Sequence, residues 1–310
     1  MQNAPPEVDR DALTRVEASL NRVLLGKPEA VRLSLICLLA NGHLLIQDQP
    51  GVGKTTLAHA LAQVLGLNYR RIQFTSDLLP GDVLGVSVFE QARSRFEFHP
   101  GPIFTQVLLA DEVNRAPPKT QSALLEAMQE RQVSVDGNTY PLPEPFFVIA
   151  TQNPLEQIGT HPLPESQLDR FLMCIELGYP DTQSERALLE GLGHRDDSQP
   201  VPAEASPADL QTWQATVTAV TTTPPLLDYL QALLQASRDP ALFQSGLSPR
   251  AGLGLLRAAR ASALLDGRTF VTPDDVRRVL PALAVHRITS RDPGSREAAV
   301  DRLLECVPAE

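Results

Sequence analysis

The fold of this chain is decided by the stretch Pro50-Gly51-Val52-Gly53-Lys54-Thr55-Thr56. It stands between a short apolar run, His43–Ile46, which we expect to be a strand, and a predicted helix over Lys54–Leu65 that ends at Gly66. Glycines between a strand and a helix let successive backbone N–H groups turn toward one point, and the helix N-terminus adds positive charge there. This arrangement is typical of a loop that binds phosphate groups.

Two side chains of the loop have the chemistry that a bound nucleotide requires. Lys54 is long enough to reach the β- and γ-phosphates, and the hydroxyl group of Thr55 is a suitable ligand for Mg²⁺. The sequence departs from the strict pattern at Asp48, where that pattern has a glycine. A glycine-rich turn with an exposed lysine is the alternative interpretation, but the position between a strand and a helix favours a nucleotide site. The candidate nucleotide-binding residues are Pro50, Gly51, Val52, Gly53, Lys54, Thr55 and Thr56.

The first 178 residues alternate between strand and helix patterns. Buried strands in parallel sheets are apolar almost throughout, because helices cover both faces of the sheet. Helical spacing separates the apolar runs, as in Pro117–Arg131. We therefore expect a mostly parallel sheet with helices on both faces. After His43–Ile46, the predicted strands are Arg70–Phe74, Gln106–Ala110, Pro145–Thr151 and Leu172–Leu177.

Beyond residue 180 only helical signals follow, and we expect no strand there. Helices are predicted to begin at Ser206-Pro207, Pro225, Ser248-Pro249 and Thr272-Pro273, where a capping side chain or a proline in the first turn favours a helix start. The predicted plan is an α/β nucleotide-binding domain over residues 1–178, a linker and connecting helix over 179–224, and a helical domain over 225–310.

Two adjacent carboxylates, Asp111 and Glu112, end the predicted strand Gln106–Ala110. Asp111 is placed to hold Mg²⁺, and Glu112 to polarise the water that attacks the γ-phosphate. A solvated acidic pair at a strand end is the alternative. The phosphate-binding loop upstream favours the catalytic interpretation.

Three further residues complete the candidate site. Asn153 follows the strand Pro145–Thr151, at the edge where ligands of parallel sheets bind, although Asn-Pro is also an ordinary turn. Arg170 and Arg250 are candidates for spreading positive charge over the γ-phosphate, within one chain or from a neighbouring subunit. Spacing alone does not distinguish these two from the other arginines, many of which form surface ion pairs.

Composition excludes several classes of protein. The 310 residues carry a net charge of −10, which disfavours a protein whose main task is to hold nucleic acid. The longest apolar run, Leu35–Ala40, is too short to span a membrane, and the N-terminus has no apolar leader. The 3 cysteines lie far apart and have no metal-ligand spacing. We expect a cytoplasmic protein without a membrane segment or a disulfide framework.

Several blocks of the sequence resemble the MoxR-type AAA+ ATPases, over roughly residues 10–290. The most specific is Asp111-Glu112-Val113-Asn114-Arg115-Ala116-Pro117-Pro118. Members of this family often have an acidic or non-glycine residue at the position of Asp48. The other matching blocks are Gly101-Pro102-Ile103-Phe104, Ala150–Pro154, Leu163–Phe171 and Ser248-Pro249-Arg250-Ala251.

The resemblance implies an AAA+ module with five parallel strands in the order 5-1-4-3-2, followed by an all-α lid domain. It implies binding of ATP and Mg²⁺, a homo-hexameric ring, and chaperone-like remodelling or maturation of a protein client, commonly a protein with a von Willebrand factor A domain. The roles it implies are Walker A for Lys54 and Thr55, Walker B for Asp111 and Glu112, sensor 1 for Asn153, sensor 2 for Arg250, and the arginine finger into the next subunit for Arg170, with Arg115 as the alternative finger.

The family's wider clade carries two insertions, which fall here near Val83–Pro100 and Gln132–Pro145. Alternating side chains in the first predict a hairpin with its turn at Glu90–Ser94. We expect this hairpin to face a client or the ring pore. The alternative is a hairpin that only covers its own domain.

Three other functions remain open. The net charge disfavours a nucleic-acid-dependent AAA+ motor. The carboxylate of Glu112 and the separate helical domain disfavour a small-molecule kinase with a phosphate-binding loop. The sequence does not separate the remodelling function from that of a chelatase-type motor subunit.

Overall fold

The computed structural model describes residues 10–154, 159–191, 201–291 and 295–308. A five-stranded sheet forms its centre, in the order β2-β5-β8-β1-β9, and every neighbouring pair is parallel. This confirms the predicted order 5-1-4-3-2. The strands are β1 (Leu44–Gln47), β2 (Tyr69–Gln73), β5 (Val107–Asp111), β8 (Phe147–Gln152) and β9 (Met173–Ile175).

The position of each strand in the sheet explains its sequence. Every residue of β5 and β8 is buried, because other strands flank both and helices cover both faces. The edge strand β2 is different, since only Ile72 is buried and Arg70 and Arg71 are exposed. The apolar content of a strand therefore indicates how central it is.

Helices pack on both faces of the sheet around two apolar clusters. One cluster joins the first face to the helices of the C-terminal part, so the lid and the sheet share a continuous core. The first face carries α1 (Arg10–Val23), α2 (Pro28–Leu39) and α3 (Lys54–Val64), and the second α4 (Pro80–Leu84), the 3₁₀ helix η1 (Val113–Arg115), α5 (Pro118–Glu130) and α6 (Glu165–Leu168).

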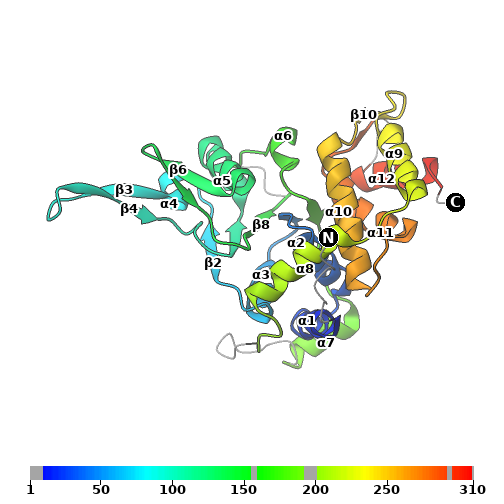
Figure 1. Cartoon of the computed structure of the whole chain (residues 1–310), viewed down its shortest axis with the longest axis horizontal. Helices are drawn as coiled ribbons and strands as arrows, with labels where there is room; N and C mark the ends of the chain where they lie inside the picture. The colour runs from blue at the N-terminus through cyan, green and yellow to red at the C-terminus, as the bar shows by residue number, and fades with distance from the viewer. Residues whose placement is uncertain (1–9, 155–158, 192–200, 292–294, 309–310) are drawn as a thin grey trace, which may run out of the picture.

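The C-terminal part is helical, as expected (Figure 1). Ser206, Ser248 and Thr272 precede helices at the predicted positions, and the Ser248 hydroxyl accepts a hydrogen bond from the Ala251 N–H. The helices are α7 (Thr182–Leu189), α8 (Pro207–Ala219), α9 (Pro224–Ser237), α10 (Pro249–Leu265), α11 (Pro273–Ala284) and α12 (Arg296–Cys306). Even α10, the longest with 17 residues, is not a membrane span: within the described ranges no helix combines the length and the apolar character for that.

One expectation for this part is wrong. The antiparallel strands β10 (Phe243–Ser245) and β11 (Thr289–Ser290) form a short ribbon where no strand was predicted. Each is too short to show an alternating pattern, and the partner lies far away in the sequence. Such a ribbon arises from tertiary packing and not from local preference.

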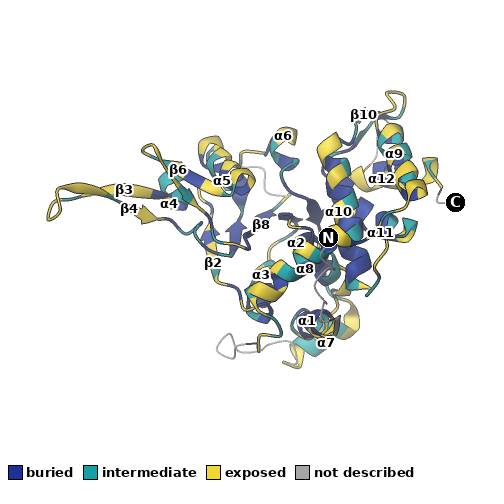
Figure 2. Ribbon diagram, in the orientation of Figure 1, coloured by how far each residue is buried: buried dark blue, intermediate teal, exposed yellow. Residues whose placement is uncertain are grey.

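Two β-hairpins extend from the sheet domain. The predicted hairpin is present as β3 (Gly85–Glu90) and β4 (Arg95–Pro100), paired from Gly85 with Pro100 to Glu90 with Arg95. It forms an arm that projects from the body, and most of its surface is exposed (Figures 1 and 2). The second insertion is a shorter hairpin of β6 (Gln132–Val135) and β7 (Asn138–Pro141).

A buried carboxylate, Asp275, stabilises the start of α11. Its oxygens accept hydrogen bonds from Arg268 Nη1 at 2.6 Å and Nη2 at 2.7 Å, Ser262 Oγ at 2.9 Å, and the hydroxyl and amide of Thr272, both at 2.9 Å. Its side chain is 1% exposed. Burial alone would raise the pKa of Asp275, but these hydrogen bonds outweigh it and lower the pKa.

Replacing this carboxylate tests how strongly it stabilises the lid. We expect Asp275→Asn to lower the free energy of unfolding by about 2 kcal/mol, because a buried amide cannot accept all the hydrogen bonds that the carboxylate accepts from Arg268, Ser262 and Thr272. Urea denaturation at pH 7 measures the change, with the neighbouring exposed acid variant Asp274→Asn as the matched control. The difference from wild type should shrink as the pH falls below about 4, since the stabilisation from a lowered pKa is lost on protonation. Equal stability of the two variants would contradict this role.

Candidate active site

The candidate residues of three strands gather at one edge of the sheet. The phosphate-binding loop follows β1, Asp111 ends β5, and Asn153 follows β8, which lies between β5 and β1. Parallel strands end at the same edge, so Asn153 lies between the loop and the carboxylates. The structure thus brings together the residues predicted for Walker A, Walker B and sensor 1.

The loop has the backbone that its glycines allow. Gly51 and Gly53 have φ angles of 84° and 102°, which side chains disfavour, and Gly53 directly precedes α3. The Lys54 ammonium group donates a hydrogen bond to the Asp48 carbonyl oxygen at 2.6 Å. Burial lowers the pKa of Lys54, and the nearby carboxylates of Asp111, Asp48 and Glu112 oppose that shift. Lys54 therefore lies in the field of both predicted Walker B residues.

Asp48, the departure from the strict loop pattern, has a structural role that a glycine cannot fill. Its carboxylate accepts hydrogen bonds from the amides of Gln49 at 2.7 Å, Leu177 at 2.7 Å and Gly178 at 2.6 Å. Lys27 donates to the carbonyl oxygens of the same Leu177 and Gly178, at 2.8 and 2.6 Å. Asp48 thus ties the phosphate-binding loop to the segment that follows β9.

The Asp111 carboxylate is held from two sides. Its Oδ1 accepts a hydrogen bond from the Thr151 hydroxyl at 2.6 Å, and its Oδ2 accepts from Arg71 Nη2 at 2.6 Å and Nε at 3.2 Å. Thr151 in turn accepts from the Glu112 amide at 2.9 Å. The sequence does not identify Arg71 as a partner of Asp111, because this contact depends on the pairing of β2 with β5.

Glu112 has different partners from Asp111. Its backbone is left-handed, with a φ of 56°, so the chain turns sharply directly after β5. Its carboxylate accepts a hydrogen bond from Gln73 at 2.8 Å and forms an ion pair with Arg115 at 3.0 Å. Arg115, the alternative arginine finger, therefore contacts the predicted catalytic carboxylate of its own chain.

The donor atoms at this edge fit Mg²⁺. Thr55 is exposed in the first turn of α3 and offers a hydroxyl oxygen, and Asp111 offers a carboxylate oxygen. Proteins commonly bind Mg²⁺ through one or two such groups together with phosphate oxygens of the substrate. Across the described ranges, no three His, Cys, Asp or Glu side chains form a metal site of protein ligands alone.

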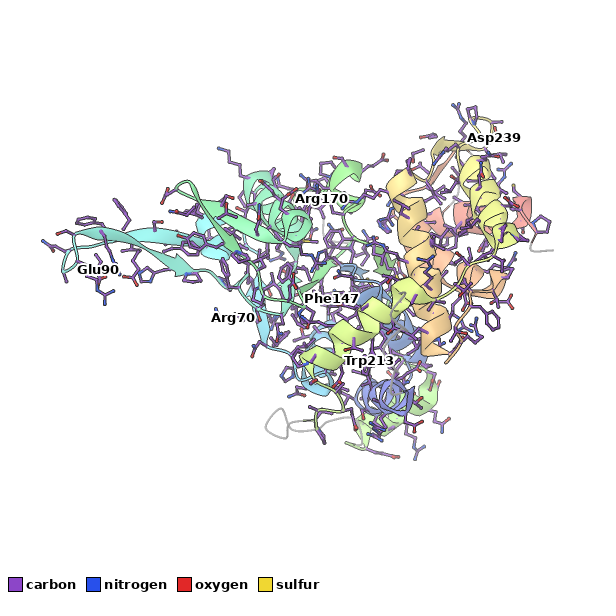
Figure 3. All side chains as sticks on the ribbon, viewed as in Figure 1. Arg70, Glu90, Phe147, Arg170, Trp213 and Asp239 are labelled. Carbon is purple, nitrogen blue, oxygen red and sulfur yellow. The ribbon has the colours of Figure 1, made fainter. Side chains whose placement is uncertain are left out.

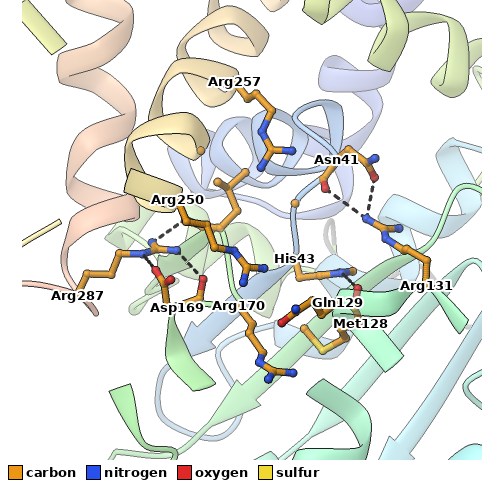
Figure 4. A pocket seen from close by; sticks show the side chains of 13 residues that line it. Asn41, His43, Met128, Gln129, Arg131, Asp169, Arg170, Arg250, Arg257 and Arg287 are labelled. Carbon is orange, nitrogen blue, oxygen red and sulfur yellow. Dashed lines mark hydrogen bonds and ion pairs between the residues drawn. The ribbon is translucent and has the colours of Figure 1, made fainter. Parts of the chain in front are cut away.

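The structure places Arg170 and Arg250 elsewhere. Both line a cavity of about 260 Å³ near His43 and Leu172, which precede or enter β1 and β9 (Figure 4). This is the amino-terminal edge of the sheet, and the four residues of β1 separate it from the phosphate-binding loop by about 13 Å. Neither arginine is thus brought to the phosphate-binding loop of its own chain, although Arg250 is the predicted sensor 2.

The cavity is strongly basic. Besides Arg170 and Arg250 it is lined by Arg131, Arg257 and Arg287. Arg131 donates to backbone and side-chain oxygens of the sheet domain. The guanidinium groups of Arg170, Arg250 and Arg257, in contrast, have no hydrogen-bond or ion-pair partner among the described residues. Burial, and after it the charge of Arg250, lowers the pKa of Arg257.

His43 in this cavity is held by backbone groups on both ring nitrogens. Its Nδ1 accepts a hydrogen bond from the Val148 amide at 3.1 Å, and its Nε2 faces the Met128 carbonyl oxygen at 3.2 Å. Burial and the nearby Arg131 lower the pKa of His43 to about 3. The imidazole is therefore neutral and fixed in one tautomer.

Comparison with known proteins matches both parts of the chain. A model of the ATPase family associated with various cellular activities (AAA) matches residues 43–173, and a model of the AAA lid domain matches residues 235–305. Chaperone MoxR1 of Mycobacterium tuberculosis is 40% identical over 313 residues, which cover 95% of this chain and 81% of that protein. The chain belongs to the MoxR family of AAA+ ATPases.

Two further proteins are similar to this chain over most of its length. The uncharacterized protein YeaC of Bacillus subtilis is 47% identical over 273 residues, which cover 87% of this chain and 84% of that protein. The crystal structure of a presumptive ATPase from Cytophaga hutchinsonii aligns with a TM-score of 0.89 at 36% identity, covering 97% of this chain and 96% of that one. The edge with the predicted nucleotide-binding residues lies within residues 43–173, the part of the chain that the AAA model matches.

The tie made by Asp48 leads to a prediction for nucleotide binding. We expect Asp48→Asn to weaken ATP binding about tenfold, because an amide cannot accept hydrogen bonds from three backbone N–H groups and the loop loses its anchor. Calorimetric titration measures the affinity, and Asp136→Asn, in the exposed turn between β6 and β7, is the control. An unchanged affinity in a folded Asp48→Asn protein would show that the loop keeps its shape without this carboxylate.

Proposed function

We propose that this chain hydrolyses ATP with Mg²⁺ at sites shared between neighbouring subunits of a homo-hexameric ring, and uses the cycle to remodel a protein client. One observation carries the proposal. The phosphate-binding loop, Asp111, Glu112 and Asn153 lie at one edge of the parallel sheet, and the guanidinium groups of Arg170 and Arg250, unpaired within the described part of the chain, lie at the other.

A shared site follows from charge. Hydrolysis develops negative charge on the γ-phosphate, and positive groups fixed around it lower the barrier. Arg170 and Arg250 cannot reach the loop of their own chain across the sheet. A second subunit stacked edge to edge presents them there, and such a head-to-tail contact closes into a ring when repeated with the right rotation. Arg170 is then the finger, because Arg115 contacts Glu112 of its own chain.

The residues at the loop edge divide the chemistry among them. Lys54 and the loop amides bind the phosphates, and Asn153 orients the attacking water or the γ-phosphate. The Glu112 carboxylate takes a proton from that water once the nucleotide draws it away from Gln73 and Arg115. Mg²⁺, held by Thr55 and Asp111, neutralises phosphate charge when bound.

A second cavity suits the base of the nucleotide. It has a volume of about 450 Å³, and its lining is mostly apolar. It includes Gln47 and Leu177, next to the anchor of the phosphate-binding loop, and Val285 and Val300 of the lid. We assign it to adenine. With the proposed division into residues 1–178, 179–224 and 225–310, the nucleotide then lies between the first and third parts and couples them.

The hairpin arm is the proposed client contact. Its outer end presents Phe89 and Phe96, which are 53% and 71% exposed and whose rings pack edge to face at 5.3 Å. Phe98, on the same face, instead stacks on Tyr140 at 4.1 Å, so the second hairpin supports the base of the arm. The two alternatives for the hairpin, client contact and cover for its own domain, thus apply to different residues. Phe98 packs against its own domain, whereas Phe89 and Phe96 remain exposed. Figure 3 shows Glu90 on the arm, well away from Arg170.

A protein client fits this surface better than a nucleic acid does. Exposed aromatic and β-branched side chains on a projecting arm suit apolar segments of a protein. The arm's Arg93 is paired with Glu90 and Glu97, which leaves little free positive charge for phosphates. A von Willebrand factor A-domain protein is the client class that the family suggests.

Mixing subunits tests the shared site. Arg170→Ala and Arg250→Ala should each bind ATP with an affinity within about threefold of wild type, and Arg170→Ala should lose roughly 10³-fold in turnover, as for fingers supplied in trans. Glu112→Gln should also be inactive, because an amide cannot take a proton. A mixture of Arg170→Ala and Glu112→Gln chains should regain activity, since one type of interface keeps both groups.

The control for this experiment is Arg186→Ala, an exposed arginine on α7 that should have no effect. Phosphate release measures turnover, and fluorescence transfer between labelled chains verifies subunit exchange. A mixture as inactive as its parents, despite exchange, would exclude a site shared in this way.

Replacing the aromatic pair tests the role of the arm. The double variant Phe89→Ser/Phe96→Ser should keep basal ATP turnover within about threefold of wild type, about 0.6 kcal/mol of barrier, because the arm is outside the ATP site. It should lose the stimulation of turnover by an unfolded polypeptide, for which reduced α-lactalbumin is the probe. The control Arg95→Ser alters the same arm but keeps both rings. Full stimulation of the double variant would exclude the aromatic pair as a client contact.

A further inference from the structure

We propose that Arg287, directly after lid helix α11, is a positioning residue for the arginine finger Arg170. It holds the segment that carries Arg170 and binds the neighbouring carboxylate of Asp169, so that Arg170 stays free for the next subunit's nucleotide. This inference rests on the proposed shared site.

The hydrogen bonds of Arg287 separate it from the other arginines of the basic cavity. Its Nε donates to Asp169 Oδ1 at 2.7 Å, and its Nη2 donates to the carbonyl oxygens of Asp169 at 3.1 Å and Phe171 at 2.6 Å. Its Nη1 donates to the carbonyl oxygens of Leu172, at 3.1 Å, and of Leu283. A guanidinium has five N–H groups, and all five are used. Arg287 therefore has no donor left for a phosphate, although it lines the cavity.

Asp169 explains why such a partner is needed. It is the only acidic residue among the described residues that line the cavity, and it directly precedes Arg170. An unpaired carboxylate there would pair with Arg170 or Arg250, or repel an incoming phosphate. The ion pair with Arg287, whose side chain is only 7% exposed, removes both possibilities.

The same contacts fix the backbone around Arg170. On one side, the Arg170 amide donates to Gln167 at the end of α6. On the other, Phe171 is completely buried, its carbonyl oxygen also faces His286 Nε2 at 3.2 Å, and the Leu172 amide donates to His43 as the chain enters β9. Most of these bonds come from the lid. The position of the lid therefore determines where Arg170 is presented (Figure 4).

The end of α11 also connects the two cavities. Val285 lines the cavity that we assign to adenine, and Arg287, two residues later, lines the basic cavity. A lid shift that accompanies the chain's own nucleotide would thus reach the arginine that serves the neighbouring subunit. Through Arg287, nucleotide binding in one subunit would change the position of Arg170 at the site of the next subunit.

The variants Arg287→Lys and Asp169→Asn test this role. Lysine keeps the charge but cannot make five bonds in a fixed plane, so we expect turnover to fall about a hundredfold, as for a displaced catalytic group. The affinity for ATP at the chain's own loop should stay within about threefold of wild type. Mixing with Glu112→Gln chains should restore activity, as we also predict for Arg170→Ala. Arg278→Lys, at an exposed position of α11, is the control.

Asp169→Asn lets Arg287 keep its five hydrogen bonds, since the amide oxygen still accepts from Nε, but it removes the negative charge of the ion pair. We expect a smaller loss of turnover, about threefold to tenfold, that is again restored by mixing. A residue with a merely structural role would lower the unfolding temperature and ATP affinity together, and mixing would not restore activity. Thermal unfolding of every variant separates these cases.

Three results would overturn the proposal. One is an Arg287→Lys protein with turnover within threefold of wild type. Another is an inactive, folded Arg287→Lys protein that mixing does not restore while it does restore Arg170→Ala. The third result matters if Arg287→Lys does not fold. In that case, an Asp169→Asn protein with the full activity of wild type would overturn the proposal. Failure of the Arg170→Ala mixture itself would instead refute the shared site.

Discussion

All five strands of the central sheet point in the same direction, and the rest of the molecule depends on that constraint. The carboxyl ends of β1, β5 and β8 meet at one edge, which places a phosphate-binding loop, two carboxylates and an asparagine together. The segments that enter β1 and β9 meet at the opposite edge, where the guanidinium groups lie. In a sheet with strands of mixed direction, neither the loop and carboxylates nor the arginines would be gathered at a single edge.

Much of the fold was predictable because its signals are local. The glycines of the phosphate-binding loop and the capping residues Ser248 and Thr272 act on neighbouring peptide groups, so the sequence around them is sufficient. The strand order came from the resemblance to a family and not from the pattern itself. The ribbon of β10 and β11 escaped prediction because it depends on packing between distant parts of the chain.

The candidate site shows the same division. Lys54, Asp111 and Glu112 could be identified from their neighbours in the sequence. The partners Arg71 and Gln73 could not, because they reach the carboxylates only through the pairing of β2 with β5. The location of Arg250 also escaped prediction, since the docking of the lid on the sheet decides it. The sequence thus identifies the chemical groups of a site more readily than it shows at which edge of the sheet each group lies.

The separation of loop and arginines within one chain has a consequence for how the activity is controlled. If the site is shared as proposed, each copy alone holds two halves that belong to different sites, and neither half is complete. Activity per chain would then rise with protein concentration, since mass action fills the interfaces. A dilute copy would bind ATP and keep it intact. The local concentration of the protein would then determine whether it only binds ATP or also hydrolyses it.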